Sequence, residues 1–235
     1  MERIDKIIAS QTNYSRKDVK KLISQKKVRV NDEIVKRPEQ KFDEQQDEIY
    51  IDENKLDMKK HIYLVLNKPQ GYISATEDRT AKTVLDLVPE QYMRKRLFPA
   101  GRLDKDTTGM MIITDDGEFA HNILAPRKHI EKTYKVQIDI DITEEMREKF
   151  KQGIVLKDHV CCPATIVVKD KNTALITITE GKYHQIKRMF GCFGAKVVRL
   201  HRISMGGLQL PRDLEEGQCR ELTKEELEKV CTRDK

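Results

Sequence analysis

The chain has 235 residues, of which 38% are hydrophobic and 36% are charged. This balance is typical of a polar globular protein with room for one medium domain and one small domain. No apolar run approaches the ~18 residues that a membrane span needs, and the stretch Met1–Lys6 has no apolar signal region. The sequence therefore argues against a membrane or secreted protein, and we expect a cytoplasmic one.

Five cysteines are present, an odd number, and they show no Cys-x-x-Cys or His-x-x-x-His spacing. Zinc sites and disulfide frameworks are usually recognised by such spacings. We therefore expect reduced thiols and no metal site. The cysteines are Cys161, Cys162, Cys192, Cys219 and Cys231.

The net charge of +6 is concentrated in two segments. Residues 1–37 hold eleven Lys and Arg against five acids, and residues 181–202 hold six Lys and Arg with no acid. Either segment alone is also compatible with a solvated surface. Together they favour a polyanionic partner that is contacted at two places.

Two short helices are expected first, over residues 4–8 and 16–23, where apolar residues recur at helical spacing. Ser15 is placed to cap the second helix. A hairpin of Val28–Val30 and Ile34–Val35 follows, with a turn at Asn31 and Asp32. Four basic residues fall on the second helix away from its apolar face: Arg16, Lys17, Lys20 and Lys21.

The strings Ser15–Ile23 and Val28–Asn31 resemble the S4 RNA-binding domain. This domain commonly has glycine after the turn asparagine, where this chain has Asp32, a residue still compatible with positive φ. The resemblance implies RNA binding by the four basic helix residues and by Arg29. We expect this small module to span residues 1–52, a linker to span 53–60, and a larger domain to span 61–235.

The larger domain is predicted to begin with the strand His61–Asn67 and a turn that carries Lys68. A lysine on a turn is ordinarily solvated, although it can also meet a phosphate. Residues 84–97 are expected to be helical in two pieces, with a break at Pro89.

The stretch Gly101–Gly109 is predicted to be a tight loop that feeds the buried strand Met110–Thr114. It carries Asp104, and a carboxylate with a pKa near ~3.9 is a ready nucleophile at pH 7. Arg102 is the nearest cation in the sequence that could pair with it. Loops rich in Asp, Thr and Gly are also ordinary turns, so the string alone leaves both interpretations open.

The rest of the chain predicts alternating strands and helices. Pattern alone favours Tyr134 as a core aromatic and His184 as a structural histidine. Lys182, Lys187 and Arg188 fall outside the apolar stripe of their helix. The expected elements are a helix over 117–124 that begins at Asp115 or Asp116, a strand over 132–138, a helix over 143–152, strands over 164–168 and 174–178, a helix around 185–193, a strand over 196–202, and a last helix capped by Thr223 and Glu226.

Three strings in order, Gly101–Gly109, Lys132–Tyr134 and Gly181–Phe190, resemble the motifs of the RsuA family of ribosomal RNA pseudouridine synthases. With the S4-like module, the resemblance covers essentially the whole chain. It implies an α+β fold, in which a small S4-like α/β module precedes a catalytic domain. That domain would have a largely antiparallel mixed sheet flanked by helices.

The resemblance also implies residue roles. Asp104 would be the nucleophile, Tyr134 would lie against the base and remove its C5 proton, and Lys187 would contact the catalytic carboxylate. Arg102 would either fill the space of the flipped base or pair with the carboxylate. The expected substrate-binding residues are Lys68, Ile186, Gly101 and Leu103, and the expected RNA-binding residues of this domain are Lys182 and Arg188.

No cofactor or metal is needed for such an isomerisation. Details of the three motifs resemble the small-subunit (16S) enzyme, which implies ribosomal RNA or a small-subunit assembly intermediate as partner, and we expect a monomer. A large-subunit enzyme and a non-catalytic assembly factor are the alternatives. A magnesium nuclease built on Asp104, Asp106, Asp115 and Asp116 is less favoured, because a five-residue strand of ~17 Å would separate the two pairs.

Overall fold

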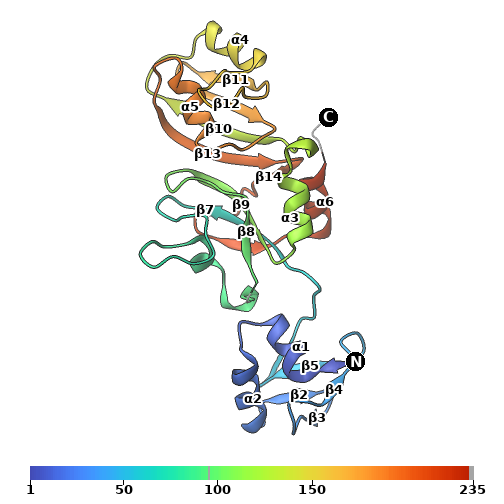
Figure 1. Cartoon of the computed structure of the whole chain (residues 1–235). Helices are drawn as coiled ribbons and strands as arrows, with labels where there is room; N and C mark the ends of the chain where they lie inside the picture. Colours follow the sequence, from blue (N-terminus) through green and yellow to red (C-terminus); the bar gives the residue numbers. More distant parts are fainter. Residues whose placement is uncertain (95, 233–235) are drawn as a thin grey trace. The chain divides into compact units, whose positions relative to one another are not determined.

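The computed structural model describes residues 1–94 and 96–232, which form two compact units. The first unit combines Met1–Ile62 with Pro89–Leu97, and the second combines Tyr63–Val88 with Phe98–Lys235. Figure 1 shows residues 1–62 of the first unit in shades of blue, and its second segment after Pro89 in green. The predicted domain end at residue 235 lies outside the described residues. Within these residues, no helix is long and apolar enough to cross a bilayer.

The first unit packs two helices on small sheets. One sheet has the strand order β3-β2-β5-β6, and β1 pairs with β4. The elements are β1 (Glu2–Arg3), α1 (Ile4–Gln11), α2 (Arg16–Ser24), β2 (Val28–Val30), β3 (Glu33–Ile34), β4 (Lys41–Phe42), β5 (Ile49–Ile51), β6 (Asn54–Lys55) and a 3₁₀ helix, Glu90–Tyr92.

Local chemistry explains the start of α2. Ser15 accepts a hydrogen bond from the backbone N–H of Asp18, and the Asp18 carboxylate accepts one from the N–H of Ser15. This reciprocal box satisfies two donors that the first helical turn leaves open. Ile7, Val19 and Ile49 then meet in one buried cluster from both helices and the sheet.

Three expectations for this unit need correction. Strand β6 pairs with β5 inside the predicted linker 53–60, so this segment continues the sheet of the first unit. The second hairpin strand is Glu33–Ile34 rather than Ile34–Val35. The positive φ of the turn lies at Asn31, at 51°, because asparagine itself tolerates the left-handed region.

In the described part of the second unit, nine strands form one sheet. Its main order is β11-β12-β10-β13-β9-β7-β15, and β14 and β8 pair with β13 and β9. All pairs are antiparallel except β9 with β13. The strands are β7 (Tyr63–Lys68), β8 (Phe98–Ala100), β9 (Thr108–Thr114), β10 (Lys132–Ile138), β11 (Thr165–Asp170), β12 (Thr173–Ile178), β13 (Val197–Met205), β14 (Leu208–Gln209) and β15 (Cys219–Glu221).

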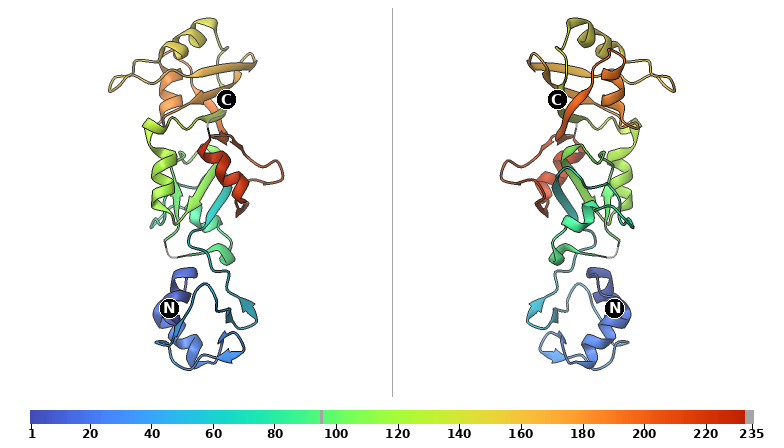
Figure 2. Two further views of the ribbon diagram at one scale, coloured as in Figure 1. Left: turned by 90° about the vertical axis from the view of Figure 1, so that its right-hand side faces the viewer. Right: turned by 90° about the vertical axis from the view of Figure 1, so that its left-hand side faces the viewer.

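Helices cover this sheet near both of its ends. Phe150 of α4 and Phe190 of α5 meet with ring centroids 4.9 Å apart, in the yellow and orange part of Figure 2. Ile123 of α3 and Val230 of α6 join a second cluster with Met110. The helices are α3 (Gly117–Leu124), α4 (Glu144–Gln152), α5 (Gln185–Gly191) and α6 (Lys224–Cys231), with 3₁₀ helices at Val84–Leu87 and Pro126–Lys128.

The predicted α+β fold is confirmed, and the largely antiparallel sheet with one parallel pair makes it a mixed one. The predicted starts of α3, α4 and α6 are found at the caps Asp116, Thr143 and Thr223. Residues 84–97 are different from the prediction. They form only two 3₁₀ turns around Pro89, while residue 95 lies outside the described part.

Candidate active site

The site forms on the loop before β9, where Asp104 faces Lys187 of α5 and His184 of the loop that leads into α5. Lys187 places Nζ 2.8 Å from Oδ2 of Asp104, and His184 places Nε2 3.4 Å from Oδ1. Lys187 also donates to Oδ1 of Asp106 at 2.6 Å. The predicted contact between Lys187 and the carboxylate is therefore present, whereas Arg102 is exposed and does not form an ion pair with Asp104 within the described residues.

Protonation follows from this shared cation. Burial acts to lower the pKa of Lys187, but its hydrogen bonds to Asp104 and Asp106 outweigh burial and raise the pKa. Burial is likewise the largest influence on Asp106 and acts to raise its pKa, but the hydrogen bond and the charge of Lys187, with smaller contributions, together lower the pKa. The Lys187 ammonium and the Asp106 carboxylate therefore stay ionised near neutral pH.

A pocket opens above this cluster. Tyr134 of β10 is only 6% exposed and contributes to its wall, together with Leu103 and Ile186, which are both buried. Arg102, Lys182 and His184 also line the pocket. A carboxylate, an aromatic ring and apolar side chains thus face one cavity, as the binding of a planar base beside a nucleophile requires.

The loop of Asp104 is held by the segment that follows β7. Ser74 Oγ donates to the carbonyl of Leu103 at 2.7 Å and accepts from its N–H at 2.9 Å. Gly71 donates its N–H to the carbonyl of Lys105 at 2.8 Å. These bonds tie both sides of Asp104 to a neighbouring loop, so its backbone position is fixed independently of Lys187.

Lys68 has a different role from the predicted substrate contact. Its side chain is fully buried, and burial lowers its pKa to about 8. It lies beneath the catalytic loop, where it cannot meet a phosphate, and it holds the loop through backbone oxygens. Nζ donates to the carbonyls of Pro69, Asp104, Lys105 and Thr107 at 3.2, 3.1, 3.4 and 2.8 Å.

Gly101 also departs from its predicted role, because it does not line the pocket. Its φ is +96°, and an added Cβ would lie 2.8 Å from Leu124 Cδ2. We therefore infer that this position needs glycine for its backbone conformation and for the lack of room for a side chain, rather than for contact with the substrate.

His184 joins the site although its sequence pattern predicted a structural histidine. Its backbone is left-handed, with φ 47° and ψ 33°, at the residue before α5. Gln185 beside it is buried and bonds the buried Glu180, which also accepts from the N–H of Cys162. These hydrogen bonds fix the loop that carries His184. No spacing rule in the sequence could have shown that His184 lies beside Asp104.

The predicted RNA contacts divide into free and engaged cations. The basic residues of α2 and Lys182 are exposed, as expected. Arg188 instead pairs with Asp158, a bond that lowers the pKa of Asp158 to about 2. Arg202, from the second basic segment, is 2% exposed and donates to the carbonyl of Met110. These two arginines are therefore structural.

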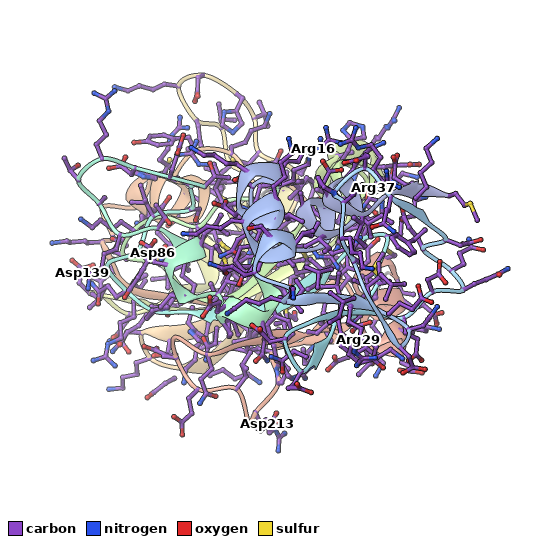
Figure 3. The ribbon with its side chains drawn as sticks, turned by 90° about the horizontal axis from the view of Figure 1, so that it is seen from below. Arg16, Arg29, Arg37, Asp86, Asp139 and Asp213 are labelled. Carbon is purple, nitrogen blue, oxygen red and sulfur yellow. The ribbon has the colours of Figure 1, made fainter. Side chains whose placement is uncertain are left out.

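Arg29 of the first unit lies over the Tyr50 ring, 3.9 Å from its centroid, and pairs with Asp32. Figure 3 shows it well separated from Arg16 of α2.

The four carboxylates of the nuclease hypothesis do not form one cluster. Asp116 caps α3 and accepts a hydrogen bond from the Tyr63 hydroxyl at 2.6 Å, at the far end of β9 from Asp104. Within the described chain, the grouped donors that could hold an ion are His159, Cys161 and Glu180, which are not part of the Asp104 cluster. The geometry of Asp104 thus favours nucleophilic chemistry over metal-dependent cleavage.

Residues 62–191 match the family described as RNA pseudouridylate synthase, and residues 2–49 match the S4 domain. The chain belongs to this pseudouridine synthase family, in its RsuA-like form with an N-terminal S4 domain. Its activity is that of an isomerase.

Relatives align over nearly the whole chain. The uncharacterized RNA pseudouridine synthase YtzG of Bacillus subtilis (strain 168) is 41% identical over 230 residues, 96% of each chain. Ribosomal small subunit pseudouridine synthase A of Escherichia coli (strain K12) is 40% identical over 230 residues, 97% of this chain and 99% of the relative. A crystal structure of a pseudouridylate synthase superposes with a TM-score of 0.69 at 38% identity and covers 98% of this chain and 100% of that one.

Proposed function

We propose that the chain converts one uridine of small-subunit (16S) ribosomal RNA into pseudouridine, with Asp104 as the nucleophile. The observation that carries the proposal is the Asp104 carboxylate, held by Lys187 at 2.8 Å in a pocket that Tyr134 also lines. The choice of ribosomal subunit is supported by relatives such as the Escherichia coli enzyme, which is named for the small subunit.

The reaction breaks the N1–C1′ glycosidic bond, turns the base, and joins C5 to C1′, while the proton lost from C5 is replaced by one gained at N1. Reactant and product are isomers, so electrons and atoms balance without a co-substrate. Asp104 attacks the sugar or the base, and Lys187 orients its carboxylate through the ion pair. Tyr134 packs against the uracil ring and takes the C5 proton.

The target uridine has to leave its stack to reach Asp104, which costs a few kcal/mol. Arg102 is exposed at the pocket and has no ion pair with Asp104 in the described chain. This placement supports the first of its two expected roles, occupation of the space that the base vacates. The exposed lysines of α2 and Lys182 bind the flanking phosphates.

The test is tritium release from unmodified 16S RNA labelled at C5 of uridine. The wild type should release tritium, and Asp104→Asn should release none above background, because an amide is not a nucleophile at neutral pH. Asp106→Asn is the matched control. It removes the other carboxylate on Lys187 and should slow release by less than about tenfold, or 1.4 kcal/mol.

Mapping of the product identifies the uridine and separates the 16S from the large-subunit proposal. If naked RNA gives no release, the same assay is run on assembling small subunits. Equal release by the wild type and Asp104→Asn would contradict the assigned nucleophile.

A further inference from the structure

An exposed aromatic side chain stands at the rim of the Asp104 pocket. Tyr183 is 75% exposed, although an aromatic ring ordinarily contributes most when its area is buried. Its neighbours Lys182 and His184 both line the pocket. The position of Tyr183 therefore calls for an explanation other than core packing.

The exposed ring is held in a defined orientation. The Tyr183 and His184 rings lie 3.9 Å apart between centroids, with an angle of 18° between their planes. His184 in turn places Nε2 3.4 Å from Asp104. One face of Tyr183 thus rests on a residue of the catalytic cluster, and the high exposure leaves the opposite face to solvent.

The backbone that carries this pair is held in place by hydrogen bonds. The N–H of Lys182 donates to Gln185 Oε1 at 3.0 Å, and the N–H of Gln185 donates to the carbonyl of Lys182 at 3.2 Å. Gln185 is itself buried against Glu180. These contacts hold His184 in a left-handed conformation that a residue other than glycine adopts only at a cost in free energy.

We propose that the stacked Tyr183–His184 pair is a platform for the nucleobase next to the target uridine. This inference rests on the proposed function and names a second base-binding site for the same RNA. When the uridine flips out, its neighbour loses a stacking partner. A flat aromatic face restores that contact without regard to base identity, and the exposed ammonium of Lys182 is placed to meet the adjoining phosphate.

Kinetics test the platform through substitutions that keep or remove the flat face. Tyr183→Leu retains apolar volume and should lower kcat/KM about ten- to hundredfold, mainly through KM, as loss of one stacked base predicts. Tyr183→Phe keeps the ring and should restore most of that loss. Val155→Ala removes another exposed apolar side chain of the same unit, 72% exposed, as the control. Equal kinetics for the Leu and Phe variants would overturn the proposal.

A direct measurement uses the absence of tryptophan from the chain. Tyr183→Trp in the Asp104→Asn background gives a single indole reporter without turnover. Its fluorescence should be quenched by RNA that spans the modified uridine. The quenching should disappear when an abasic nucleotide replaces the neighbour on one side of that uridine.

The two proposals can fail separately in this design. Unchanged fluorescence with every RNA that binds would overturn the platform, even where the wild type releases tritium. Base-dependent quenching without tritium release by the wild type would support the platform and overturn the assigned reaction.

Discussion

Lys187 is the residue on which the charge balance of the catalytic cluster depends. It bonds Asp104 and Asp106 at once, at 2.8 and 2.6 Å. Two carboxylates that share one site repel each other, and the ammonium between them offsets this repulsion. Lys187 acts to lower the pKa of Asp106, while its contact with Asp104 orients the carboxylate that faces the pocket.

Buried lysines give the protein a testable pH dependence. Burial, with the nearby charge of Arg202, lowers the pKa of Lys132 to about 8, from an ordinary value of 10.5. Between these pH values the unfolded chain binds more protons than the folded one, so the free energy of unfolding rises with pH. Lys132→Met should reduce this rise by up to about 3 kcal/mol in urea unfolding at pH 7.5 and 10.5.

Lys135→Met, at an exposed position of the same strand, is the control and should leave the rise unchanged. If the free energy of unfolding depends on pH in the same way in the Lys132 variant and the wild type, then folding does not lower the pKa of Lys132.

Individual site residues were predictable to different degrees. Asp104, Tyr134, Ile186 and Lys187 were expected from motif resemblance, and all four reach the same pocket. The roles of Lys68 and Ser74 depend on backbone groups of a loop that lies 39 and 29 residues further along the chain, which no side-chain pattern encodes. Nearness in sequence made Arg102 a candidate partner of Asp104, but the fold supplies Lys187, the contact that the motif resemblance implied.

At the scale of elements, the parallel pairing of β9 with β13 joins the two halves of the catalytic sheet. Thr108 faces His201 and Gly109 faces Arg202 in this register. A Cβ on Gly109 would lie 2.3 Å from the carbonyl oxygen of Arg202, and its φ is +100°. Only glycine allows the strands to approach this closely directly after the catalytic loop.

We therefore expect Gly109→Ala to lower the free energy of unfolding by more than about 3 kcal/mol, through overpacking and backbone strain together. Thermal or urea unfolding measures the loss. Gly191→Ala at the end of α5 is the control, since its added Cβ meets nothing within 4 Å. Similar stabilities of the two variants would contradict the proposed need for close approach.

Elements with local signals were the predictable part of the fold. Caps at Ser15, Asp116, Thr143 and Thr223 mark helix starts through contacts within three residues, so the sequence contains them. The segment 84–97 has apolar residues but is interrupted at Pro89, and its described residues, 84–94 and 96–97, form only short 3₁₀ turns. The parallel pair is set by contacts about ninety residues apart, which periodicity does not report.

At the scale of the whole molecule, the proposed phosphate contacts fall in both units, whereas the proposed chemistry falls in the second. Arg16, Lys17, Lys20 and Lys21 of α2 are exposed cations outside the catalytic unit. Each phosphate contact contributes about 0.7–0.9 to the slope of log affinity against log salt. Replacing all four residues with Gln should reduce the magnitude of that slope by about 3 in filter-binding titrations with 16S RNA.

The control removes an equal charge elsewhere, at Lys149, Lys151, Lys157 and Lys171, which are exposed in the second unit. If both quadruple variants lose the same slope, RNA attraction is a property of total charge and α2 has no special role.

Three cations buried in the catalytic unit affect how the protein should respond to salt. Lys68, Lys132 and Arg202 are 0%, 6% and 2% exposed, and none forms an ion pair within residues 1–94 and 96–232. Dissolved ions screen exposed charges over ~10 Å at 0.1 M, but they do not penetrate a packed sheet. These buried charges are therefore shielded from dissolved ions, and Lys68 interacts instead with the charges of Asp106 and Asp104. Rising ionic strength should then hinder the capture of RNA and leave the turnover of captured RNA almost unaffected.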